Sequence, residues 1–258
     1  MPYSDIIEED RDGIRIVKMN RPEAKNAIGG KMAAELLDAI TTFARKPDLK
    51  ALVLTGAGDA AFCAGGDIKE MEAMDYRAAR EFAVAAHKLV DAIEGTGKPV
   101  VSAVNGLALG AGCDLALACD LCFASQSARF GLPSLRVGVI TPFGGMSRLI
   151  DRVGVSKAKS MIFTGTIIGA EEAKAIGIAY SVLPASDFLQ GTVRQVHEIL
   201  KRTPAAFALG KKLLVANSTS KSADEEEIEL YASCFRTSDQ KEGALAFRQK
   251  RDPNFTGT

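Results

Sequence analysis

Short apolar runs that alternate with amphipathic stretches constrain this chain more than any other feature. The runs are β-branched or apolar and are bounded by charge, Gly or Pro, as buried strands are. They cover Ile14–Met19, Ala51–Thr55, Val100–Val104 and Leu121–Ala124. Between them, residues 32–43 and 82–93 place apolar side chains along one helix face. Because strands joined by crossovers pair in parallel, the sequence predicts an α/β fold of repeated β-β-α units over its first two-thirds.

The last third of the chain has a different pattern. Strand-like runs stop after about residue 185, and apolar residues then recur at helical spacing up to residue 235. Helices without a sheet of their own must pack on the preceding body or on another subunit. We therefore expect a core domain over residues 1–190 and a helical oligomerisation region over residues 191–258.

Glycine-rich turns follow two of the strand-like runs. The first spans residues 62–67 (Phe-Cys-Ala-Gly-Gly-Asp), and the second spans residues 106–114 (Gly-Leu-Ala-Leu-Gly-Ala-Gly-Cys-Asp). Glycine lets a backbone approach a ligand closely, and the first N–H groups of a helix have no partner inside it. Two such turns can polarise one carbonyl oxygen between them, which favours acyl chemistry on a thioester. Tight packing of a strand on a helix selects the same small residues, so the second turn alone leaves both interpretations open.

Asp114 is the candidate acid/base because it follows the second turn and precedes the apolar residues 115–118. Burial there would raise its pKa, as a general acid or base needs, although an aspartate in a first helical turn is also an ordinary capping residue. The two histidines, His87 and His197, each lie within an amphipathic helix, where a histidine usually has a structural role. The sequence also lacks a G-x-S-x-G elbow. A Ser-His-Asp hydrolase therefore has little support.

The charge and hydropathy patterns exclude several classes of protein. Thirty-two basic and thirty-two acidic residues cancel, so the chain as a whole has no electrostatic attraction for nucleic acid or anionic membranes. Its start lacks the order of a signal peptide, and no apolar run approaches the ~18 residues of a membrane span. Five cysteines, an odd number in mostly apolar surroundings, fit reduced thiols. We expect a cytoplasmic protein that binds neither nucleic acid nor membrane.

Two motifs resemble cofactor sites but lack the context for them. Residues 56–61 match the G-x-G-x-x-A dinucleotide fingerprint, which should open a long helix, whereas Gly65-Gly66 would break such a helix a few residues later. A plain surface turn is the preferred interpretation. Cys119 and Cys122 have the spacing of a C-x-x-C motif, but no second ligand pair follows them. The sequence therefore predicts no metal and no cofactor apart from the substrate.

Several segments, taken together and in order, resemble the crotonase superfamily, which is the enoyl-CoA hydratase/isomerase family. They are Asn20-Arg21-Pro22-Glu23-Ala24-Lys25-Asn26-Ala27, residues 62–71, residues 98–114, Phe130-Gly131 with Gly144-Gly145, and residues 242–255. The resemblance implies a crotonase (ClpP-like) fold with a helical C-terminal trimerisation region, usually assembled as a trimer or a dimer of trimers. It also implies an acyl-CoA thioester as the substrate, with coenzyme A present only as part of that substrate.

The same resemblance assigns roles to individual residues. The N–H groups of Gly66 and Ala111 form an oxyanion hole for the thioester carbonyl, which agrees with the interpretation of both turns. Further positions are assigned to the coenzyme A moiety. Ala24, Ala64 and Ile68 line its path, Asp67 lies at the rim, and Phe247 and Lys250 reach the nucleotide end of a neighbouring subunit's ligand.

The chain departs from the hydratases of that family at the acid/base positions. They place one glutamate where this sequence has Asp114 and a second where it has Ser134. A serine hydroxyl can hydrogen-bond to water but has no accessible carboxylate-like pKa. Residues 141–143 (Thr-Pro-Phe) also replace a common loop of the family and reshape the pocket wall. Ordinary hydration by two glutamates is therefore not expected.

The leading hypothesis is an acyl-CoA lyase of the enoyl-CoA hydratase kind, with Asp114 as the sole acid/base and Ser134 orienting a water or a substrate group. Double-bond isomerisation, decarboxylation and retro-aldol cleavage remain open, because each passes through the same thioester enolate. A protein that binds acyl-CoA without turnover is the alternative from another class.

Overall fold

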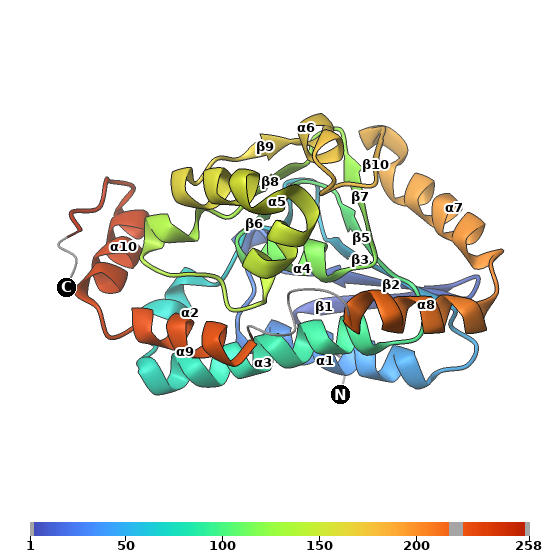
Figure 1. The fold of residues 1–258 in the computed structure, drawn as a ribbon, viewed down its shortest axis with the longest axis horizontal. Helices are drawn as coiled ribbons and strands as arrows, with labels where there is room; N and C mark the ends of the chain where they lie inside the picture. Colours follow the sequence, from blue (N-terminus) through green and yellow to red (C-terminus); the bar gives the residue numbers. More distant parts are fainter. Residues whose placement is uncertain (1–2, 217–223, 256–258) are drawn as a thin grey trace.

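The structure is a computed structural model that describes residues 3–216 and 224–255. It contains two sheets (Figure 1). The six-stranded sheet has the order β1-β2-β3-β5-β7-β10, and its strands are Ile6–Arg11, Ile14–Met19, Ala51–Gly56, Val100–Val104, Leu121–Ser125 and Ser181–Leu183. The four-stranded sheet has the order β4-β6-β8-β9, and its strands are Ala61–Cys63, Leu107–Leu109, Arg129–Gly131 and Ile168–Gly169.

The β-β-α repeat distributes its strands between the two sheets. In each of the pairs β3–β4, β5–β6 and β7–β8, the first strand joins the larger sheet and the second joins the smaller one. All neighbours in the larger sheet are parallel except β1 and β2, which form an antiparallel hairpin. The predicted α/β fold of repeated β-β-α units is confirmed.

Helices cover both faces of the larger sheet. Those in the first part of the chain are α1 (Gly30–Arg45), α2 (Ile68–Glu72), α3 (Tyr76–Gly95), α4 (Ala111–Ala118), α5 (Gly145–Thr164) and α6 (Ala170–Ala175). Those that follow are α7 (Phe188–Leu200), α8 (Pro204–Ala216), α9 (Asp224–Cys234) and α10 (Ser238–Gln249). Short 3-10 turns form η1 (Pro22–Ala24), η2 (Pro133–Val137) and η3 (Ala185–Asp187). Figure 1 shows α1 and α3 along one side of the sheet and α7 on the other.

Strand residues alternate between two hydrophobic clusters, which explains why the strands read as continuous apolar runs. Val17 and Leu54 belong to the large cluster with α1 and α3, whereas Ile16 and Val53 pack against Val196 of α7. All four predicted strands and both predicted helices are present. The other strands were not predicted, because β4, β6, β8, β9 and β10 span two or three residues each and β1 is rich in charge.

The C-terminal helices beyond residue 185 are present as predicted, and two of them, α7 and α8, pack on the core. The predicted division at residues 190/191 falls within α7, which packs on the sheet, and the division itself stays a prediction. On α8, Lys211 is buried, and its Nζ donates to the Ile93 carbonyl at 2.9 Å and to Asp120 at 2.8 Å. Among the described residues, no helix combines the length and the apolarity that crossing a membrane requires.

Candidate active site

The two glycine-rich turns lie against each other. Gly65 has φ +121° and Gly110 has φ +51°, conformations that favour glycine. A Cβ built on Gly110 would lie 3.8 Å from the Cα of Gly65, and one built on Gly65 would lie 3.3 Å from the carbonyl oxygen of Leu109. Residues separated by about 45 positions in the chain thus meet at the ends of β4 and β6.

The N–H groups of Gly66 and Ala111 are the donors that this arrangement leaves available. Ala111 is the first residue of α4, so its N–H has no acceptor within the helix. Within residues 3–216 and 224–255, no hydrogen bond of either N–H is found. The positive end of the α4 dipole adds to the attraction for a partly negative oxygen. The geometry is that of a site which can polarise a carbonyl.

Close packing explains the other glycines of the second turn. A Cβ on Gly112 would lie 2.0 Å from the carbonyl oxygen of Cys63, and one on Gly106 would lie 2.5 Å from that of Ala60. Contacts this short exclude any side chain, so α4 and β6 rest directly on β4. The packing interpretation of the turn holds for Gly106 and Gly112, whereas Gly110 and Ala111 form the part that carries the free N–H, and its role in polarising a carbonyl stays a prediction.

Asp114 is fully buried in the first turn of α4. Burial raises the pKa of its carboxyl well above the ordinary range, the negative charge of Glu227 raises the pKa further, and Thr141 and Arg148 lower it. Neither carboxyl oxygen has a hydrogen-bond partner among the described residues. Gly145 makes room for this side chain, because a Cβ there would lie 1.6 Å from Asp114 Oδ1. Asp114 is a carboxyl group that holds a proton strongly, rather than a helix cap.

Two hydroxyl groups share this buried, unpartnered condition. The Oγ of Ser134 on η2 and the Oγ1 of Thr141 are both buried, and neither has a hydrogen-bond partner among the described residues. Ser134 follows β8 by three residues, and the carbonyl of Gly131 at the end of β8 accepts from the Gly110 N–H at 3.0 Å. Buried polar groups are almost always satisfied in native proteins, so unpartnered ones point to a ligand or water.

The segment 20–27 is tied to the first turn by Asn26. Its buried Nδ2 donates to the carbonyls of Ala61 at 2.8 Å and Ala57 at 3.0 Å. The N–H of Ala64 donates to the carbonyl of Lys25 at 3.0 Å, which brings Ala24 and Ala64 close together. Ala24, Ala64 and Ile68 are all half-buried. These three positions thus surround the first turn, as the predicted path of the coenzyme A moiety requires, although their role stays a prediction.

Asp67 caps α2 and is paired. Its Oδ1 accepts from the N–H of Lys69 at 3.0 Å, and its Oδ2 lies 2.8 Å from the guanidinium of Arg21. Burial raises the pKa of Asp67, but the hydrogen bond and charge of Arg21 outweigh it and leave the pKa below its ordinary value. Asp67 therefore begins α2 as a largely buried, paired carboxylate, and its predicted place at the rim of the coenzyme A path stays a prediction.

Phe247 and Lys250 lie on and just after α10, apart from the turns. Phe247 is exposed and lines a surface cavity that also contains Leu135 and Phe163. Lys250 ends α10 in the left-handed conformation, with φ +55°. The described contacts do not bring either residue to Gly66 or Ala111 within one chain. Their predicted contact with a neighbouring subunit's ligand stays a prediction.

Sequence reasoning did not identify the buried ionisable residues near Asp114. Glu227 on α9 and His87 on α3 are both buried, and Glu227 Oε1 lies 3.3 Å from His87 Nε2. The acidic run 224–227 (Asp-Glu-Glu-Glu) resembles a solvated helix start, and for that reason the burial of Glu227 was not predicted. The signal was the spacing of Glu227 to Tyr231, one helical turn apart on the buried face.

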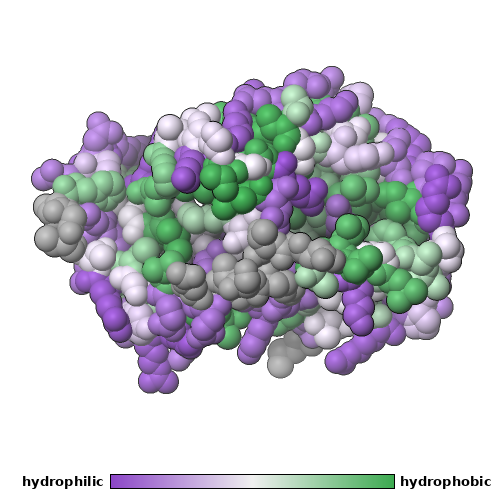
Figure 2. Space-filling view, in the orientation of Figure 1, coloured by the Kyte–Doolittle hydropathy of each residue, from purple (hydrophilic) through white to green (hydrophobic). Residues whose placement is uncertain are grey.

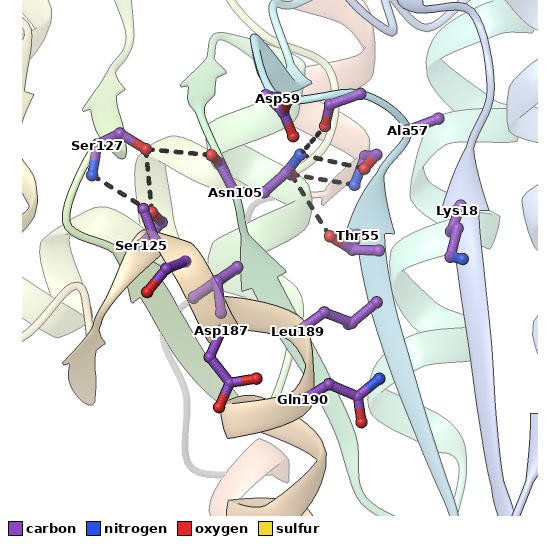
Figure 3. Close-up of a pocket in the computed structure, with 15 residues that line it drawn as sticks. Lys18, Thr55, Ala57, Asp59, Asn105, Ser125, Ser127, Asp187, Leu189 and Gln190 are labelled. Carbon is purple, nitrogen blue, oxygen red and sulfur yellow. Dashed lines mark hydrogen bonds between the residues drawn. The ribbon is translucent and has the colours of Figure 1, made fainter.

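A separate cavity of about 720 Å³ lies at the carboxyl ends of β3, β5 and β7 (Figure 3). The Nδ2 of Asn105 donates there to the carbonyls of Gly56 at 3.1 Å and Gly58 at 2.7 Å. The predicted surface turn at residues 56–61 forms one wall of this cavity and leads into β4 instead of a helix, which rules out a dinucleotide-binding helix. None of the predicted site residues lines it.

Comparison with known proteins gives matches over nearly the whole chain. A family model described as enoyl-CoA hydratase/isomerase matches residues 9–258. The crotonyl-CoA hydratase of Syntrophomonas wolfei is 38% identical over 259 residues, which cover 99% of this chain and 99% of that protein. The short-chain-enoyl-CoA hydratase of Clostridium acetobutylicum is 36% identical over 253 residues, 97% of each chain.

A solved structure gives the same result for the fold. The crystal structure of an enoyl-CoA hydratase from Mycobacterium avium subsp. paratuberculosis has a TM-score of 0.90 and 30% sequence identity, and the match covers 99% of this chain and 100% of that one. The resemblance seen in the sequence motifs is thereby confirmed over the full length, including the C-terminal helices. The chain belongs to the enoyl-CoA hydratase/isomerase family.

Proposed function

We propose that this protein is an acyl-CoA lyase that adds water to the double bond of a short enoyl-CoA thioester. The observation that carries the proposal is the pair of touching glycine turns with free N–H groups at Gly66 and Ala111, together with the buried carboxyl of Asp114 in the helix turn that Ala111 begins. The names of the full-length relatives in S. wolfei and C. acetobutylicum support the same chemistry. Substrate binding requires no cofactor beyond the coenzyme A that the substrate carries.

In the proposed mechanism, the thioester oxygen accepts hydrogen bonds from Gly66 and Ala111. Water adds its oxygen to the β-carbon, and the electron pair of the double bond moves to form an enolate held by those two N–H groups. Asp114 takes the proton that leaves the water and delivers it to the α-carbon, which restores the carbonyl. Once it is ionised, a carboxylate with a raised pKa is a stronger proton acceptor than an ordinary one, so burial of Asp114 suits this role. Ser134 orients the water.

Other reactions of a thioester enolate are the second candidate. Isomerisation, decarboxylation and retro-aldol cleavage need the same oxyanion hole and a single acid/base, which Asp114 supplies. The hydroxyl at Ser134 favours these alternatives, because hydration by two carboxylates is not available there. A protein that binds acyl-CoA without turnover remains the alternative outside enzymes.

Self-association is part of the proposal. The outer face of α8 exposes Leu209, Leu213 and Leu214 at 71%, 65% and 76%, and Figure 2 shows a hydrophobic area over this helix. An apolar area of this kind marks an interaction site. We place it within a trimer or a dimer of trimers, in which Phe247 and Lys250 would contact a neighbour's ligand. Free cysteines, four of them buried, favour a reducing compartment such as the cytoplasm.

The substitution Ala111→Pro tests the oxyanion hole, because it removes one N–H at the helix position where proline is best tolerated. Exchange of the α-protons of butyryl-CoA in D₂O reports enolate formation whatever the overall reaction. We expect exchange to fall about 10²–10³-fold. The matched control is Ala170→Pro, which changes the first residue of α6 after a glycine and should leave exchange unchanged.

The products then separate the candidates. Incubation of crotonyl-CoA in H₂¹⁸O, followed by mass spectrometry, should give a hydrated thioester that contains the label. Enolate exchange without hydration would instead identify one of the alternative reactions. Tight acyl-CoA binding in calorimetry, with neither exchange nor product, would overturn the enzymatic proposal.

A further inference from the structure

A second buried carboxylate lies close to Asp114, and it comes from the C-terminal helices. Glu227 of α9 is 7% exposed. Its Oε1 accepts a hydrogen bond from the N–H of Gly144 at 2.5 Å and lies 3.3 Å from the Nε2 of His87 on α3. A buried carboxylate needs such partners, because an isolated charge inside a protein is costly. The contacts with Gly144 and His87 therefore hold Glu227 at a defined position.

One dipeptide connects the two carboxylates. Gly144 donates its N–H to Glu227, and the next residue, Gly145, packs against the carboxyl of Asp114 so closely that a Cβ would lie 1.6 Å from Oδ1. Gly144 is the N-cap of α5, with φ +69°, and Gly145 is the first residue of that helix. A movement of Glu227 would thus be transmitted to the wall of the Asp114 site over a single peptide link.

Aromatic packing fixes α9 where Glu227 can make these contacts. The ring of Phe82 on α3 lies 5.9 Å from that of Phe143 and 6.3 Å from that of Tyr231 on α9. Tyr231 is among the largest fully buried side chains. The three rings join α3, the loop before α5, and α9 into one unit around Glu227.

The remaining groups that face the pair are few among the described residues. Arg148 of α5 lies at 2.7 Å from Glu94 and donates to the Phe143 carbonyl at 2.7 Å, and its charge lowers the pKa of Asp114. Thr141 also lowers it. The buried thiols of Cys63 and Cys113 have their pKa raised by burial and by Asp114. Burial and the charge of Glu227 outweigh Arg148 and Thr141, so the net direction for Asp114 is upward.

We propose that Glu227 is a positioning residue that acts through Asp114: held by Gly144 and His87, it places a second negative charge behind the site and thereby controls when Asp114 takes up and releases its proton. The negative charge of Glu227 on α9 thus provides the electrostatic effect of a second carboxylate, which the hydroxyl of Ser134 cannot provide. This inference rests on the proposed function only in assigning the acid/base role to Asp114.

The test is the substitution Glu227→Gln, which keeps an oxygen acceptor for the Gly144 N–H and removes the charge. The titration of Asp114 is followed by carboxyl ¹³C NMR, with its signal assigned by its loss in Asp114→Asn. Because a like charge disfavours ionisation, removal of the Glu227 charge should move the titration midpoint of Asp114 to lower pH. The limb of the turnover pH profile that reports Asp114 should move in the same direction.

The matched control is Glu229→Gln on the same helix. Glu229 pairs with Tyr76 and Arg80 and is not among the groups that shift Asp114. We expect it to leave the Asp114 midpoint in place. An equal shift in both variants, or an unchanged midpoint in a correctly folded Glu227→Gln protein, overturns the proposal.

Two further outcomes also decide the question. If Glu227→Gln does not fold, Glu227→Met, which removes the charge at a similar side-chain volume, is titrated instead and must also move the Asp114 midpoint to lower pH. An unchanged midpoint in that variant overturns the proposal. If the wild-type protein converts no thioester, the proposed function fails, whereas the NMR titration still decides the role of Glu227.

Discussion

The two glycine-rich turns each deliver an aspartate, and the two aspartates have opposite environments. Asp67 follows Gly65-Gly66, caps α2 and is paired with Arg21 at 2.8 Å, and its pKa is lowered. Asp114 follows Gly110-Ala111-Gly112, has no hydrogen-bond partner among the described residues, and has a raised pKa. The same local sequence arrangement thus gives one paired carboxylate with a lowered pKa and one unpaired carboxyl with a raised pKa.

The difference arises from what packs on each turn. Arg21 comes from the segment before η1 and supplies a cation to Asp67. Around Asp114 the neighbours are glycine, a threonine hydroxyl and another carboxylate, and the one cation found there among the described residues, Arg148, is already bound to Glu94 and to the Phe143 carbonyl. The pKa of an aspartate in such a turn therefore depends on whether a cation is paired with it, as much as on the presence of the aspartate itself.

The largest expected effect separates the two aspartates by activity. Asp114→Asn removes the only proposed acid/base, and we expect turnover of crotonyl-CoA to fall roughly 10²–10⁴-fold. Asp67→Asn retains a capping side chain and loses one ion pair, so we expect little change in turnover. Steady-state kinetics of both variants test this. Equal losses in the two variants would show that the comparison does not identify the reactive group.

The second prediction concerns the space beside each turn. Gly145→Ala would place a methyl group 1.6 Å from Asp114 Oδ1, inside a packed core, whereas Gly29→Ala would meet the exposed, flexible carboxylate of Glu70 at 2.0 Å. We expect Gly145→Ala to lower the free energy of unfolding by ~1–3 kcal/mol. Gly29→Ala should lower it by less than about 1 kcal/mol. Urea denaturation compares the two, and equal stabilities would contradict the packing argument.

The third prediction is a difference in the sign of the pH dependence. Above the ordinary carboxyl pKa of 3.8, folded Asp114 keeps a proton that the unfolded chain releases, so its contribution to stability declines as pH rises toward its raised pKa. Asp67 behaves in the opposite way, because its lowered pKa gives stability above pH 3.8 that is lost on acidification. At neutral pH, Asp114→Asn should therefore be more stable than wild type and Asp67→Asn less stable.

Denaturation of these two variants between pH 4 and pH 8 provides the measurement. The stability difference between Asp114→Asn and wild type should grow with pH. A difference that is constant with pH would mean that Asp114 has the same pKa in the folded and unfolded chains.

The smallest effect concerns Thr141, which lowers the pKa of Asp114 as Arg21 lowers that of Asp67, but through a neutral hydroxyl. Its hydroxyl lowers the pKa of Asp114 and has no hydrogen bond shorter than 3.5 Å among the described residues. Thr141→Val should raise the pKa of Asp114 and shift the pH profile of turnover upward, with a stability change within about 0.5 kcal/mol. Thr192→Val, which removes a buried hydroxyl bonded to Phe188 on α7, is the control and should not move the profile.

Sequence patterns could predict the parts of this molecule in which local signals and tertiary packing agree. The long strands are apolar on both faces, and the apolar residues after Asp114 indicated its burial. The three-residue strands β4, β6 and β8 could not be predicted, because so short a segment has no measurable period. Glu227 could not be predicted either, because its burial depends on α9 docking against α3, a contact between distant segments.

The residues just before α5, Phe143 and Gly144, make completion of the Asp114 site depend on a helix that is synthesised much later. Gly144 and Phe143 are held by Glu227 and, through Phe82, by Tyr231, both of which come from α9, far beyond these residues in the sequence. During synthesis, the residues of both glycine turns emerge well before α9 does, and domains generally begin to fold from the N-terminal side. A nascent or truncated chain that stops before α9 can therefore contain the turns, but its Asp114 site lacks the contacts that close it. The Asp114 site is complete only after α9 has been made and has packed against α3 and the residues before α5.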